Sequence, residues 1–90
     1  MPTAPVINLN GTSAEVLLEE YKMAYTATQA AIEALRRMTV HGRDFQTAPE
    51  GTYEKARAEQ IARMEKLQQV GVEIVSLACE VQAQIDARPR

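Results

Sequence analysis

This 90-residue sequence has very little of the chemistry from which active sites are usually built. It has one histidine, one cysteine, no tryptophan and four aromatic residues, and it contains neither a glycine-rich phosphate loop nor a nucleophile elbow. Cys79 lies among aliphatic residues, so we expect it to be a buried packing residue. One candidate metal cluster, His41 with Asp44 and Glu50, lacks a recognisable ligand spacing. We therefore expect no catalytic residue, no cofactor and no metal.

Long apolar runs are also lacking, and this limits the cellular locations that we expect for the protein. No run approaches the roughly 20 residues that a membrane span requires, and the N-terminus has neither the basic start nor the apolar core of a secretion signal. The single cysteine is consistent with a reducing compartment. A net charge of −2 argues against nucleic acid as a partner, because such binding depends on neutralising phosphates. We expect a cytoplasmic protein that interacts with no membrane.

What the sequence does contain is helical periodicity, which predicts an all-α hairpin. Pro2 and Pro5 begin an extended arm over residues 1–12 that can pack as an apolar strap. Residues Thr12–Glu15 have the spacing of a capping box, so a helix is expected over residues 13–40. Gly42 and Pro49 interrupt the pattern, which gives a loop over 41–51 and a second helix over 52–87. Apolar and small residues form the seam of the first helix at alternating spacings of three and four: Ala14, Leu17, Tyr21, Ala24, Thr28, Ala31, Leu35 and Met38, with Leu18, Tyr25 and Ile32 beside them.

The second helix is apolar around most of its circumference between residues 70 and 81. Only Glu73, Ser76 and Glu80 are clearly polar there, and they form one narrow strip. A short isolated hairpin would leave the rest in water, so we expect antiparallel hairpins to assemble into a homo-oligomeric helical bundle. Gly71 is expected to allow close packing there. The expected oligomer interface consists of Val70, Ile74, Val75, Leu77, Ala78 and Val81.

The break between the helices is the one place where polar and aromatic groups of several kinds gather. Arg43 offers a planar set of donors, His41 another donor, and Phe45 or Tyr53 an aromatic ring. Seven of the ten basic residues lie between residues 36 and 66, where there are five acidic residues. These features favour a site for a small anion such as a cyclic nucleotide. Its candidate ligand-binding residues are His41, Arg43, Arg36, Arg37, Arg57, Phe45 and Tyr53.

A purely structural interpretation of the same residues is equally open. Arg43 and Asp44 can pair with neighbouring helices, His41 can cap the first helix through its last carbonyls, and Phe45 can close the end of the bundle. Tyr21 and Tyr25, one turn apart, can line a ligand groove or belong to a core or interface.

Two short motifs, Asn10-Gly11-Thr12-Ser13 and His41-Gly42-Arg43-Asp44-Phe45, resemble those of small uncharacterised helical-hairpin proteins of bacteriophages and prophages. The resemblance implies a phage-type accessory protein in the host cytoplasm, with counter-defence as one class of role. Our leading hypothesis is a non-enzymatic binding protein that sequesters a small nucleotide-like anion or blocks a host protein. The alternative is a structural assembly or scaffold component with no small-molecule ligand.

Overall fold

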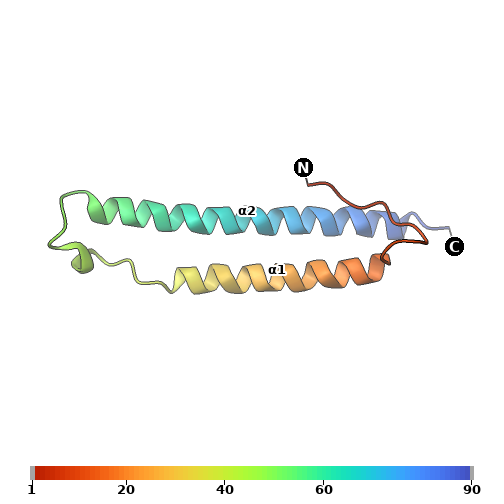
Figure 1. Cartoon of the computed structure of the whole chain (residues 1–90), viewed down its shortest axis with the longest axis horizontal. Coiled ribbons are helices and arrows are strands. Elements are labelled where there is room, and N and C mark those ends of the chain that lie inside the picture. Colours follow the sequence, from red (N-terminus) through yellow and green to blue (C-terminus); the bar gives the residue numbers. More distant parts are fainter. Residues whose placement is uncertain (1, 90) are drawn as a thin grey trace.

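The computed structural model describes residues 2–89 and consists of two long helices connected by a loop. Helix α1 runs over Ala14–Arg36, a 3-10 helix, η1, over Gly42–Phe45, and helix α2 over Thr52–Asp86. Figure 1 shows α1 and α2 side by side and antiparallel, so the all-α hairpin predicted from the sequence is confirmed. The molecule measures 67 × 21 × 19 Å, and neither helix has a stretch long and apolar enough to cross a membrane.

The seam between the helices keeps most of the residues predicted for α1. Of the predicted seam, only Ala24 and Met38 are exposed, while Ile32, expected beside the seam, is buried. The other predicted members are buried or half-buried: Ala14, Leu17, Tyr21, Thr28, Ala31 and Leu35. The buried core is small, because two helices alone enclose little volume. Its members within residues 2–89 are Ala14, Ile32, Gln60, Gly71 and Val81.

Helix α1 ends four residues before the predicted boundary, and a side chain of α2 closes it. Thr39 and Val40 are both β-branched, which disfavours a further turn. The amide Nε2 of Gln60 donates to the Leu35 carbonyl at 2.7 Å, where the backbone amide of residue 39 would donate in a longer helix. The Gln60 Oε1 accepts from Arg63 at 3.2 Å, so this buried amide is bonded at both ends.

The start of α1 is capped by Ser13 alone. Its hydroxyl accepts from the Val16 amide at 3.2 Å, which places the N-cap one residue later than the predicted Thr12–Glu15 box requires. Glu15 is therefore free to bind Arg88, at 2.9 Å, near the end of α2. A hydrogen bond from the backbone amide of Glu15 itself, followed by the bond and charge of Arg88, lowers the pKa of this exposed carboxyl.

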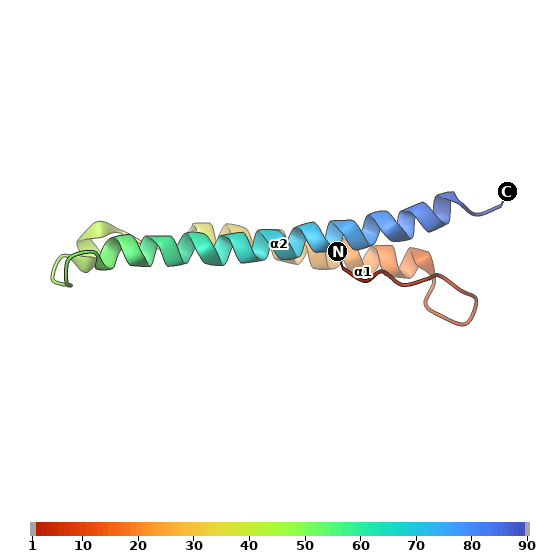
Figure 2. The same ribbon diagram turned by 90° about the horizontal axis from the view of Figure 1, so that it is seen from above.

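The N-terminal arm folds back along the C-terminal half of α2, as Figures 1 and 2 show. The Gln84 side chain holds it with two hydrogen bonds of 2.8 Å: Nε2 donates to the Pro5 carbonyl, and Oε1 accepts from the Ile7 amide. A turn at Asn8–Gly11, with a 3.2 Å bond between its ends, reverses the chain before α1. The arm is thus a strap, fixed by polar anchors with Ile7 half-buried and Val6 exposed.

Candidate functional site

The loop between the helices is organised by its own side chains. His41 is the N-cap of η1: its Nδ1 accepts from the Arg43 amide at 3.3 Å and its carbonyl accepts from the Asp44 amide at 3.0 Å. Its predicted role as the cap of α1 is therefore wrong. Phe45 packs against Tyr53, with ring centroids 6.0 Å apart, and ties η1 to the start of α2. The loop is a well-connected turn in which imidazole and both rings already have partners.

The arginines expected to form an anion site are engaged in different places. Arg36 and Arg37 both bind the same carboxylate, Glu33, at 3.0 and 3.6 Å. Arg43 is exposed, and within residues 2–89 neither it nor Asp44 forms an ion pair, so the predicted pairing with neighbouring helices does not occur. Arg57 lines an open hollow on α2 together with Tyr53, Glu54, Ala58 and Ile61. The contacts therefore do not bring these cations together around a single pocket.

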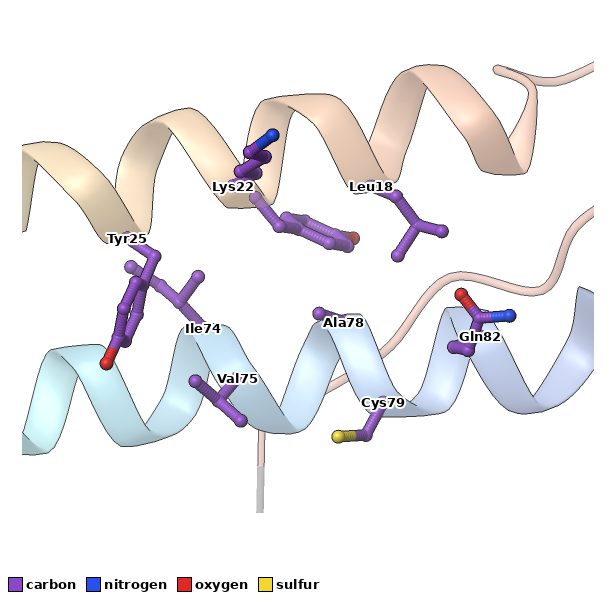
Figure 3. Close-up of a pocket in the computed structure, with 9 residues that line it drawn as sticks. Leu18, Lys22, Tyr25, Ile74, Val75, Ala78, Cys79 and Gln82 are labelled. Carbon is purple, nitrogen blue, oxygen red and sulfur yellow. The ribbon is translucent and has the colours of Figure 1, made fainter.

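An apolar groove lies elsewhere, between α1 and the C-terminal half of α2. Its volume is about 300 Å³. Figure 3 shows Leu18, Lys22 and Tyr25 on the α1 wall, with the Tyr25 ring reaching toward α2. The α2 wall faces them with aliphatic side chains, a thiol and one amide: Ile74, Val75, Ala78, Cys79 and Gln82. Nearly all of this surface is hydrocarbon, which suits an apolar side chain better than an anion.

The groove continues toward the middle of the hairpin as a second hollow of about 200 Å³. It shares Tyr25 and Val75 with the first and adds Gly71 and Val72. A methyl group on Gly71 would lie 3.5 Å from Gln29 and 3.8 Å from Tyr25, which are ordinary contacts. Packing within the hairpin therefore does not require this glycine. The two hollows form one surface, which we call the open groove.

The α2 side of the open groove is a regular stripe. Gln68, Val72, Val75, Cys79 and Gln82 are all exposed and recur at spacings of four, three, four and three. This is the repeat with which one α-helix meets another along its length. Val72 is 61% and Val75 46% exposed, so a substantial apolar surface remains in water.

The residues expected at an oligomer interface are distributed over several sides of α2. Val81 is fully buried inside the hairpin, where a second chain cannot reach it. Ile74 and Ala78 are half-buried and line the groove, as does the more exposed Val75. Val70 lies about 140° around the helix from Val75, off the groove. Leu77 is half-buried and likewise does not line the hollow.

Several groove residues were not identified from the sequence. Cys79 is exposed, so its assignment as a buried packing residue is wrong. Val72 was also not assigned to an interface. The signal for the α2 side was present in the four-three spacing of Val72, Val75 and Cys79, which is distinct from the seam that faces α1. Tyr21 and Tyr25, for which a ligand groove and a core or interface position were both considered, line the open groove.

The opposite side of α2 is the one that the arm covers. Gln84, which anchors the arm, and Gln82, which lines the open groove, are two residues apart and hence about 160° apart around the helix. The hairpin therefore has one flank covered by its own chain and one flank that is bare.

Comparison with protein-family models, with curated proteins and with solved structures found no significant match. In the part of the chain that the structure describes, no group of three or more histidine, cysteine, aspartate or glutamate side chains is arranged to hold a metal ion. The open groove is thus the feature on which a functional argument rests.

Proposed function

We propose that this chain is a non-enzymatic accessory protein that acts by binding, and that its first partner is another copy of itself. The open groove carries the proposal, because it presents an apolar surface with helical spacing that nothing in the hairpin covers. Hairpins that pair through this surface form the homo-oligomeric helical bundle expected from the sequence.

The surface area of the hairpin supports self-association. Its solvent-accessible area is 7036 Å², whereas a compact monomer of this mass exposes roughly 5,200 Å². The difference, roughly 1,800 Å² per chain, is on the scale that each partner contributes to a large permanent interface. The radius of gyration of 19.4 Å likewise exceeds the roughly 12 Å of a compact chain of this length.

The biological role that we propose follows from this architecture together with the motif resemblance. In the phage context that the resemblance implies, an assembled bundle would block a host protein surface stoichiometrically. Sequestration of a small anion at the loop has less support, because Arg36 and Arg37 are both engaged with Glu33. A scaffold role without a ligand uses the same groove, and isolation with assembly proteins would favour it.

Substituting Val75 tests the proposal. Val75→Glu places a carboxylate in the groove, and burying it unpaired in a bundle costs several kcal/mol, so the dissociation constant should rise by about 100-fold or more. Sedimentation velocity across a concentration series measures this. Met23→Glu is the matched control, because Met23 is 65% exposed but lies about 160° around α1 from Tyr25.

Two results would contradict the proposal. One is a wild-type chain that sediments as a folded monomer at about millimolar concentration, where even a weak specific pair would form. The other is an assembly that Val75→Glu leaves intact and Met23→Glu disrupts, since the contact would then be on the outer face of α1.

A further inference from the structure

We propose that the helix occupying the open groove is α2 of a second copy, antiparallel to the first, with the twofold axis of the pair passing beside Val75. This inference rests on the proposed self-association and specifies its register. It follows from the order of residues along the exposed stripe, from the charge of the two ends of the hairpin, and from the area left uncovered.

The stripe is nearly symmetric about Val75. Gln68 and Gln82 each lie seven residues from it, and Val72 and Cys79 lie three and four residues from it. Two antiparallel helices that cross at Val75 therefore place Gln68 beside Gln82 of the second copy and Val72 beside Cys79 of the second copy. Side-chain amides can donate to and accept from one another. At each end of the apolar contact, Gln68 of one copy would therefore form hydrogen bonds with Gln82 of the other.

The charge of the hairpin favours this direction over a parallel one. Residues 36–66, at the loop end, carry seven basic and five acidic side chains, whereas the rest of the chain carries three basic and seven acidic ones. Parallel hairpins would bring like ends together. In an antiparallel pair that crosses at Val75 the two positive loop ends point away from each other, so the pair avoids the repulsion that a parallel pair would have there.

A second copy also matches the open groove in length and in chemistry. The stripe from Gln68 to Gln82 spans about 21 Å of helix, at 1.5 Å per residue. A helix satisfies its own backbone hydrogen bonds, so it can lie on a hydrocarbon surface such as this one without unpaired amides. A twofold pair buries the same stripe on both chains, so the assembly closes through this surface.

Disulfide cross-linking tests the register directly. In Val72→Cys, the new thiol should lie beside Cys79 of the second copy, and mild oxidation should give a covalent dimer. The bond cannot form within one chain, because the two positions are about 10 Å apart along the same helix, beyond the roughly 7 Å between Cα atoms that a disulfide spans. Non-reducing electrophoresis of the purified full chain, with sedimentation in parallel, gives the result.

The controls separate the alternatives. Wild-type protein should not cross-link, since antiparallel pairing offsets the two Cys79 residues by about 12 Å, and Val72→Cys/Cys79→Ser should not either. Efficient cross-linking of wild type would indicate parallel pairing and overturn the proposal. A dimer by sedimentation that does not cross-link in Val72→Cys would refute the register but leave self-association standing, whereas a monomer would refute both.

A charge exchange gives an independent test. Gln68→Glu/Gln82→Lys places opposite charges together only if the helices are antiparallel, so this double variant should dimerise as well as wild type or better. Gln68→Lys/Gln82→Lys should dimerise about tenfold more weakly than the Gln68→Glu/Gln82→Lys variant. The opposite order of affinities would overturn the proposed direction.

Discussion

The two flanks of α2 differ, because one is covered by an extended segment of the chain and the other leaves apolar side chains exposed. On one flank, an extended segment lies against the helix, and the Gln84 side chain supplies both a donor and an acceptor for its backbone. On the other flank there is no such anchor, but Val72, Val75 and Cys79 repeat at helical spacing. An extended strap has unpaired backbone groups that need polar partners, while a helix has none. The polar anchors therefore mark the flank that an extended segment covers, and their absence is consistent with the helix that we propose for the other flank.

Removing the strap should produce the largest effect, because it leaves both flanks bare. Deletion of residues 2–8 eliminates two part-buried hydrogen bonds and the burial of the Ile7 side chain, which together should lower the free energy of unfolding by roughly 2–4 kcal/mol. We expect sedimentation to show species larger than those of the full chain and thermal denaturation to show a lower midpoint. If the sedimenting species and the thermal midpoint were both unchanged, the strap would neither stabilise the hairpin nor prevent further association.

Breaking only the anchor should produce an intermediate effect. Gln84→Ala removes both bonds to the strap and should cost about 1–2 kcal/mol, mainly as detachment of residues 2–8. Hydrogen exchange at the Ile7 amide measures this detachment directly, and the exchange rate should rise about tenfold. Gln82→Ala is the matched control, two residues away on the open flank, and equal acceleration in both variants would show that Gln84 is not the specific anchor.

The ion pair between Glu15 and Arg88 should produce the smallest effect, and one that depends on pH. The carboxyl pKa is lowered from 4.5 in the folded chain, so the stabilisation is fully present above pH 4.5 and is lost as the pH falls through the folded value. Both side chains are largely exposed, so the contribution is small and is screened by salt. Glu15→Gln should therefore lower the melting temperature slightly at pH 7 and not at pH 2, and a larger difference at pH 2 would contradict this assignment.

Local sequence patterns predicted the hairpin well because its helices obey local rules. Helix α2 was expected over 52–87 and runs over Thr52–Asp86, since Gly51, with φ of 87°, and Pro89 enclose a continuous repeat. The end of α1 was placed too late because Gln60, 25 residues beyond Leu35, closes it. No local pattern contains that contact.

The candidate site was harder to predict for the same reason. The apolar circumference of residues 70–81 was recognised, but which of its sides lies against α1 and which stays open depends on the helix rotation and on distant contacts. Val81 was expected on the outer surface and is in the core, while Cys79 was expected in the core and is exposed. The contact between Gln84 and Pro5 joins residues 79 apart, beyond the range of any periodicity.

The turn that reverses the chain before α1 has a consequence for processing. Leu9 at its tip is fully exposed, and exposed loop tips are preferred sites of proteolytic cleavage. A protease that cleaves beside Leu9 would disconnect the strap from α1 and leave the peptide held chiefly by Gln84, so it could dissociate on dilution. If the open groove joins two chains as we propose, cleavage at one bond would expose a second apolar flank on each chain. Two such flanks are the minimum from which a pair can grow into a filament.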